Sequence, residues 1–194
     1  MTTLSRVFRS PRPVLVAAAL ASLVFLSCKD GSSAGNSSGE ANVADAAAQT
    51  APAPAAPGAK ADFGFQLPTV DGRSLGPKSF PGQVVVVDFW ATWCMPCRLQ
   101  AQILEPVYRD YKGRGVQFLA ANVGEEPDEV KKFLKATPFP YPVLLDPKQA
   151  TADKLGVAAL PTLLVIDKKG RMAYFQPGIA DGDTLREILK KAGA

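Results

Sequence analysis

The chain contains three continuous apolar runs after residue 61. They are Val84 to Val87, Val116 to Ala121 and Leu163 to Ile166, and their length and β-branched content indicate buried strands. Amphipathic stretches alternate with them and predict helices at Arg98 to Tyr111, Asp128 to Ala136, Lys148 to Leu155 and Asp183 to Lys191. Because strands and helices alternate, and such crossovers are right-handed, the pattern predicts an α/β sandwich.

A final strand pair closes the pattern. Lys169-Gly170 is a turn signal between the strand at 162 to 167 and a second apolar segment, Met172 to Gln176. We therefore expect the last strand to run antiparallel to its predecessor, which makes the sheet mixed. The stretch 61–194 has the size of one domain that buries a proper core.

The pattern at the start of the chain is that of an export signal. Arg6, Arg9 and Arg12 precede an apolar stretch from Val14 to Leu26. Its 13 residues would form a helix of about 20 Å, whereas a bilayer core is about 30 Å thick. The stretch is therefore too short to span a membrane comfortably.

A cysteine follows this stretch at once. Val24-Phe25-Leu26-Ser27-Cys28 resembles a bacterial lipobox, although Leu26 is larger than the usual residue at its position. The resemblance implies that residues 1–27 are removed and that Cys28 is lipidated. The alternative is a plain signal peptide with a chance cysteine.

Residues 29–60 contain Ser and Gly, then Ala and Pro, with almost no large apolar side chains. Such a segment cannot build a core, so we interpret residues 28–60 as the lipidated cysteine followed by a disordered linker. The flexible part would reach about 30 Å. The linker would let a tethered domain search a membrane surface for partners.

Charge adds little to this picture. The whole chain carries +4, and removal of the three signal arginines leaves +1. This balance does not imply nucleic acid as a partner, and it is too small to hold the protein to lipid by itself.

The candidate chemistry lies in Trp93-Cys94-Met95-Pro96-Cys97, where the first predicted buried strand runs into a helix. A cysteine at a helix start faces unpaired N–H groups and the positive end of the helix dipole, which favour thiolate. Cys94 is thus the predicted nucleophile. Cys97 returns to nearly the same face one turn later and is the predicted resolving thiol. Pro96 suits a first helical turn.

Two other interpretations of the pair are a structural disulfide and a zinc site. A structural disulfide closing so short a loop would add only about 2 kcal/mol. A zinc site needs about four ligands, but the chain has no histidine and only one further cysteine. Neither accounts for the pair as well as dithiol–disulfide exchange does, and the residues imply no metal or organic cofactor.

The run Val87-Asp88-Phe89-Trp90-Ala91-Thr92-Trp93-Cys94-Met95-Pro96-Cys97 resembles the thioredoxin active-site segment, and Leu160-Pro161-Thr162 resembles that fold's cis-proline loop. The similarity spans roughly residues 62 to 192. It is closer to the membrane-tethered, extracytoplasmic TlpA/ResA branch than to thioredoxin itself. That branch has an N-terminal strand pair, like 63 to 80 here, and an inserted helix and strand, like 126 to 145. The resemblance implies a thioredoxin-like sandwich with these additions.

The resemblance also implies roles for individual residues. Asp88 would exchange a proton with Cys97, and its burial after four valines should raise its pKa. Thioredoxin usually has a lysine on the neighbouring strand, but Val116 to Val123 has none. An aspartate open to water is the alternative.

The predicted substrate surface comprises Trp93, Met95, Pro96, Leu160 and Pro161. By resemblance Pro161 is cis, and the backbone of Leu160 pairs with an extended substrate. Trp90 is expected in the core and Trp93 at the surface. Some relatives carry a glutamate where this chain has Gln100, so no acid role transfers. Glu125 and Glu126 are expected at the start of the inserted helix without a chemical role.

Together these features predict an exported, lipid-anchored thiol-disulfide oxidoreductase acting on protein cysteines. The absence of histidine between the cysteines favours a reductase. The resemblance implies substrates such as apocytochrome c outside the cytoplasm and a membrane electron donor of the DsbD/CcdA kind.

Two other functions stay open. One is a peroxiredoxin-like thiol peroxidase, although Thr92 precedes Cys94 by two positions and not by three. The other is a tethered binding module without turnover.

Overall fold

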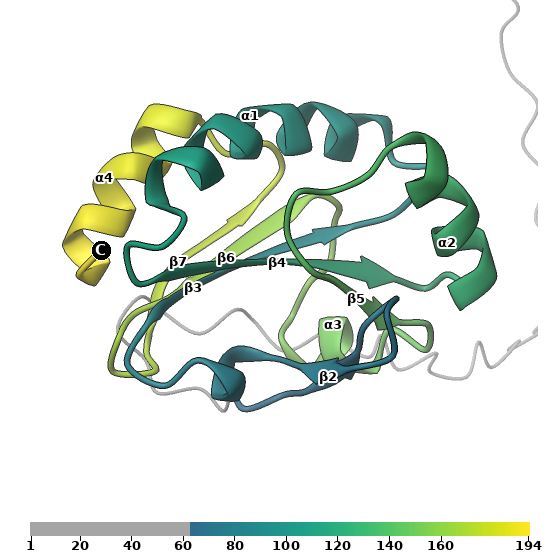
Figure 1. The fold of residues 1–194 in the computed structure, drawn as a ribbon, viewed down its shortest axis with the longest axis horizontal. Coiled ribbons are helices and arrows are strands. Elements are labelled where there is room, and N and C mark those ends of the chain that lie inside the picture. Colours follow the sequence, from purple (N-terminus) through teal and green to yellow (C-terminus); the bar gives the residue numbers. More distant parts are fainter. Residues whose placement is uncertain (1–62) are drawn as a thin grey trace, which may run out of the picture. The chain divides into compact units, whose positions relative to one another are not determined.

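A computed structural model describes residues 63–194, and the predictions for Cys28 and for segments 1–27 and 28–60 lie outside these residues. Five strands form the central sheet in the order β5-β4-β3-β6-β7 (Figure 1). Their bounds are β3 Val84–Trp90, β4 Val116–Val123, β5 Val143–Asp146, β6 Thr162–Ile166 and β7 Met172–Pro177. β3 pairs parallel with β4, and β4 pairs parallel with β5. β6 is antiparallel to both β3 and β7, so the predicted mixed sheet is confirmed.

Helices cover one face of the sheet. α1 (Met95–Tyr111), α2 (Pro127–Ala136) and α4 (Gly182–Ala192) contribute to one apolar cluster, with α1 and α4 lying along the upper side of the sheet in Figure 1. The cluster includes alternate residues of β3, namely Val84, Val86 and Trp90. The period-2 alternation of a strand explains why the intervening residues point to the other face.

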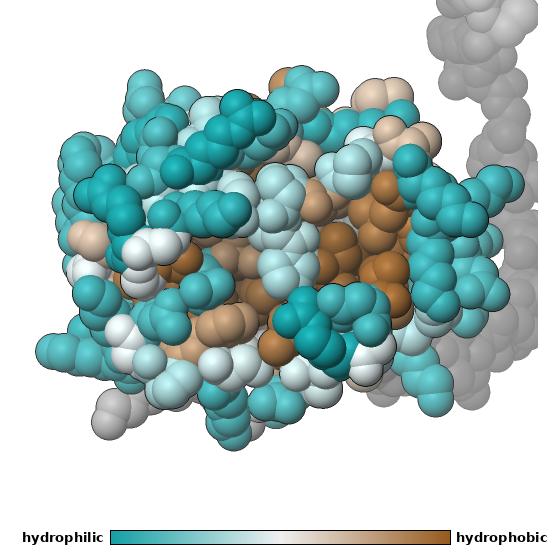
Figure 2. All heavy atoms as spheres, in the orientation of Figure 1, coloured by the Kyte–Doolittle hydropathy of each residue, from teal (hydrophilic) through white to brown (hydrophobic). Residues whose placement is uncertain are grey.

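The opposite face is covered by the N-terminal hairpin and a short helix. β1 (Leu67–Pro68) and β2 (Ser74–Leu75) pair antiparallel, and a 3-10 turn follows at Pro77–Ser79. α3 (Ala150–Lys154) lies on the same side in Figure 1, and its Ala152 packs in the second apolar cluster with Phe63, Leu67 and Phe89. In Figure 2, hydrophilic side chains cover the helices, and apolar residues show at the level of the sheet.

The predicted elements are all present, and the largest differences among the helices are in α1 and α3. α1 begins three residues before the predicted Arg98, directly after Cys94. α3 is shorter than the predicted 148 to 155. Gln149 has a positive φ of 57°, which is not a helical conformation, so the helix begins only at Ala150. Within the described residues, no helix is long and apolar enough to cross a membrane.

Candidate active site

The two cysteines lie at the end of the sheet where the chain leaves β3 and enters α1. Cys94 is the N-cap residue of α1, and its sulfur accepts a hydrogen bond from the backbone N–H of Cys97 at 3.2 Å. Cys94 and Cys97 are joined by a disulfide with a Cα–Cα distance of 5.3 Å. The sulfur of Cys94 therefore already occupies the position in which a helix N-terminus stabilises an anion.

The two flanking tryptophans differ in exposure, as expected. Trp90 is 2% exposed and packs against Phe133 and Phe139, with ring centroids 5.4 and 4.7 Å away. Trp93 is 71% exposed, and Met95 and Pro96 beside it are also exposed. The side of the turn that faces solvent is thus apolar, and the side below it is part of the core.

The predicted cis proline lies at the same end of the sheet. The Leu160–Pro161 bond is cis, and Thr162 at the start of β6 pairs with Phe89 near the end of β3. Leu160 is half-buried and packs against the apolar cluster that contains Cys94 and Cys97. Pro161 itself is buried, so Leu160 is the member of this pair that reaches the surface.

Asp88 is buried in the sheet, and the alternative of a solvated strand end is wrong. Asp88 is 1% exposed, and among the described residues neither of its carboxyl oxygens has a hydrogen-bond partner. It alternates with Val86 and Trp90, so it faces the α1 side, as do the cysteines. Burial raises the pKa of Asp88 well above its ordinary value of 3.8.

Tyr141 is the neighbour of Asp88 that shares this buried setting. Burial raises the pKa of the Tyr141 phenol, and the negative charges of Asp88 and Glu105 raise it further. The phenol oxygen has no hydrogen-bond partner among the described residues. Tyr141 also lines a cavity of about 320 Å³ together with Trp90, Cys97, Arg98 and Glu105.

Gln100 performs a task that its sequence position did not reveal. It is fully buried in α1, its Oε1 accepts from the Ala180 N–H at 2.6 Å, and its Nε2 donates to the Ala180 carbonyl at 3.4 Å. The Gly178 N–H in the same loop donates to the Pro161 carbonyl at 2.7 Å. These bonds connect α1 to the cis-proline loop. A carboxylate could accept the first bond but could not donate the second.

Glu125 corrects the sequence prediction. Glu126 is the N-cap residue of α2, as expected, but Glu125 is buried and not part of the helix start. Its carboxylate accepts hydrogen bonds from Asn122 and from Thr92, two residues before Cys94. The ends of parallel strands β3 and β4 meet at one edge of the sheet, so an acid two residues after β4 is a signal only once their adjacency is known.

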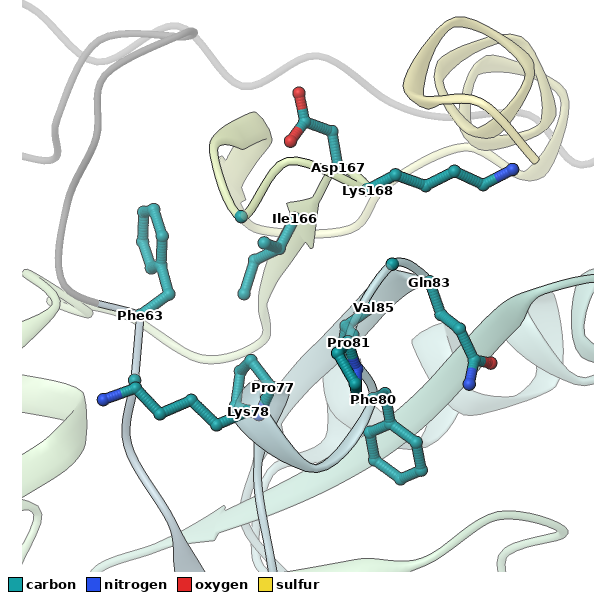
Figure 3. A pocket seen from close by; sticks show the side chains of 13 residues that line it. Phe63, Pro77, Lys78, Phe80, Pro81, Gln83, Val85, Ile166, Asp167 and Lys168 are labelled. Carbon is teal, nitrogen blue, oxygen red and sulfur yellow. The ribbon is translucent and has the colours of Figure 1, made fainter.

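A second cavity, of about 350 Å³, lies away from the cysteines (Figure 3). Its lining includes Gln83 and Val85 at the start of β3 and Ile166 and Asp167 at the end of β6, which is the opposite end of the sheet. It contains no cysteine, so the candidate site is the one around Cys94.

Comparison with known proteins identifies the family of this chain. The AhpC/TSA family model matches residues 57–175. This chain belongs to the AhpC/TSA family. Among its relatives, the thiol-disulfide oxidoreductase ResA of Bacillus thuringiensis subsp. konkukian is 33% identical over 127 residues, which cover 66% of this chain and 73% of the relative. ResA of Bacillus subtilis is 32% identical over 125 residues, covering 64% and 70%.

Solved structures share the fold of this chain. A thiol:disulfide interchange protein of the thioredoxin family from Chlorobium tepidum is 29% identical, with a TM-score of 0.58, and the match covers 66% of this chain and 92% of that one. StoA of Bacillus subtilis, at 23% identity and a TM-score of 0.56 over 64% and 94%, shares the fold. This AhpC/TSA family member is therefore a thiol-disulfide oxidoreductase of thioredoxin-like fold.

Proposed function

We propose that this protein is an exported, lipid-anchored reductase of disulfides in other proteins, including apocytochrome c, recharged by a membrane donor of the DsbD/CcdA kind. The observation that carries the exchange chemistry is the position of Cys94 at the N-cap of α1, three residues before its disulfide partner. The anchor would be a lipid on Cys28. Four exposed apolar side chains, Trp93, Met95, Leu99 and Ile179, support a protein and not a small molecule as substrate.

In the proposed reaction, the Cys94 thiolate attacks a substrate disulfide, forms a mixed disulfide and releases one substrate thiolate. Cys97 then transfers its proton to Asp88 and attacks the Cys94 sulfur, which releases the second substrate thiolate. Two electrons pass to the substrate, and Cys94 and Cys97 end as a disulfide. Burial raises the pKa of Asp88, which makes its carboxylate, when ionised, a stronger base, and this supports its role as proton acceptor.

The substrate surface would consist of Trp93, Met95 and Pro96 on one side and Leu160 and Pro161 on the other. The buried ring of Pro161 limits its part to backbone geometry, whereas the exposed Trp93 and Met95 offer apolar contact area. An extended substrate segment would pair with the backbone at Leu160.

Substitution of single cysteines tests this proposal. Reduced protein should catalyse insulin disulfide reduction, Cys97→Ser should accumulate mixed disulfides with protein substrates, and Cys94→Ser should form none. A passive binding module would give no mixed disulfide with either variant, so their absence from Cys97→Ser would contradict the proposal.

Peroxide separates the proposal from the peroxidase alternative. The Thr92 hydroxyl donates to Glu125, which leaves its hydrogen directed away from a peroxide bound at Cys94. We expect the reduced protein to consume peroxide slowly, at a rate that does not saturate with peroxide concentration. Rapid and saturable consumption without insulin reduction would favour the peroxidase.

A further inference from the structure

Glu125 is a buried acid bound by neutral groups. Glu125 is 6% exposed. Its Oε2 accepts hydrogen bonds from the Thr92 backbone N–H and the Asn122 side-chain amide, each at 2.6 Å. Its Oε1 accepts from the Thr92 hydroxyl. These three donors satisfy both oxygens of a carboxylate, which has no hydrogen of its own to place. They carry no formal charge, so they stabilise the ion without cancelling its charge.

Through Thr92, Glu125 fixes the turn that carries the nucleophile. The Arg98 guanidinium donates to the Thr92 carbonyl at 3.0 Å, so Thr92 is held from the β4 side by Glu125 and from the α1 side by Arg98. The Cys94 N–H donates to the Ala91 carbonyl at 3.2 Å, which closes the turn. The backbone from Ala91 to Cys94 is thus held at both of its ends and in its middle.

The Glu125 carboxylate is bound to Thr92, two residues before Cys94, and it is buried. Thr92, Trp93 and Glu125 line one hollow in the surface. The other charged groups that line it are Glu129 and Lys132, and Arg98 reaches Thr92 from α1; all three are exposed. Water screens exposed charges far more than buried ones, so among the charged groups of this hollow Glu125 is the least screened.

We propose that Glu125 is a positioning residue that holds the Cys94 turn through Thr92 and whose negative charge disfavours the Cys94 thiolate, which makes the dithiol a stronger reductant. A pair whose thiolate is stabilised is a strong oxidant, because the reduced state is then favoured. The helix N-terminus acts in that direction, and Glu125 opposes it. The inference rests on the proposed reductase function and supplies a physical source for its direction.

Two substitutions separate the charge from the hydrogen bonds. Glu125→Gln keeps the shape, because the amide oxygen can replace Oε2 and accept from the Thr92 N–H and Asn122. Its amide nitrogen can replace Oε1 and donate to the Thr92 hydroxyl oxygen. Glu125→Ala removes both the charge and the hydrogen bonds. Glu126→Gln is the matched control, since Glu126 is the exposed next residue and its side chain makes no cap hydrogen bond.

The measurements are the equilibrium with a glutathione or dithiothreitol couple, the insulin reduction rate and thermal unfolding, all on the whole protein. We expect Glu125→Gln to shift the exchange equilibrium about threefold to tenfold toward the dithiol at pH 7.5, with unfolding unchanged; tenfold corresponds to about 30 mV. Glu125→Ala should show a similar shift, and in addition a slower rate and a lower Tm. Glu126→Gln should match the wild type.

Two results would overturn the inference. If Glu125→Gln shows the same equilibrium as Glu126→Gln, the charge does not bias the pair. If Glu125→Ala matches Glu125→Gln in rate and Tm, the hydrogen bonds to Thr92 do not position the turn. Both readouts require a wild type that exchanges disulfides; a wild type without exchange refutes the proposed function instead.

Discussion

Asp88 is a buried acid that lowers the stability of the fold, and its proposed role in proton transfer would account for its presence. Its folded pKa is raised by burial, whereas in the unfolded chain it returns to about 3.8. Between these two values the folded state holds the extra proton, so the free energy of unfolding falls as pH rises through this window. The cost is about 1.4 kcal/mol for each pKa unit of the shift.

Asp88→Asn should therefore stabilise the fold and impair the enzyme. The gain in unfolding free energy should be absent near pH 3, grow from about pH 4 and level off above the folded pKa, because asparagine never ionises. Exchange should slow by about 100-fold, a typical loss for a missing general base. Denaturant unfolding across pH checks the first effect and insulin reduction the second. The exposed Asp128→Asn is the control; equal stability of wild type and Asp88→Asn at pH 8 would contradict this account.

The sequence predicted the cysteines and Asp88 because their signals are local. A strand of valines, an aspartate and two cysteines three apart are read from one short segment, and the structure brings these residues to one face of β3 and one end of α1. The roles of Gln100 and Glu125 were missed, since each depends on a contact with a distant segment, at Ala180 and Thr92. No periodicity encodes such contacts.

At the scale of elements, the connections around the site are as important as the elements themselves. Sequence patterns predicted four strands and four helices, and the resemblance supplied the N-terminal strand pair and the inserted strand, but boundaries depended on side-chain bonds. α3 is an example, since the Asp146 carboxylate accepts from the N–H groups of Thr151 and Ala152 at 3.0 and 2.9 Å and thereby defines where the helix begins. Asp146 lies outside the segment 148 to 155, so the apolar pattern of that segment does not indicate this cap.

Gln100→Ala tests whether α1 and the cis-proline loop act as one unit. The substitution leaves the buried N–H and carbonyl of Ala180 without their side-chain partner, which should lower the unfolding free energy by about 1–3 kcal/mol. Hydrogen exchange at the Ala180 amide should accelerate. The control is Gln102→Ala, on the exposed side of the same helix. Equal exchange at Ala180 in both variants would contradict the coupling.

At the scale of the whole molecule, the described residues contain the cysteine pair, and the proposed lipid on Cys28 would hold the protein at a membrane. Cys28→Ser should release the protein from the membrane fraction and abolish incorporation of a labelled fatty acid. Insulin reduction by the released protein should equal that of the wild type, because Cys28 is not part of the exchange site. Membrane retention of Cys28→Ser would contradict the anchor and leave the redox chemistry unaffected.

The redox direction also belongs to this scale, because it depends on the potential of the pair relative to its donor and its substrates. A value near −270 mV, as for thioredoxin, would suit a reductant, and one near −120 mV an oxidant. We expect a value toward the reducing end, because the positive helix end and the Glu125 carboxylate act on Cys94 in opposite directions.

The most direct test of the central claim is the rate of Cys94 alkylation in the reduced protein as a function of pH, followed by peptide mass spectrometry. Because its sulfur lies at the N-terminus of α1 within 3.2 Å of the Cys97 N–H, we predict a midpoint about one pH unit or more below that of free cysteine, which is about 8.5. A midpoint at or above 8.5 in the folded, reduced protein would show that the helix does not activate Cys94, and would contradict the mechanism.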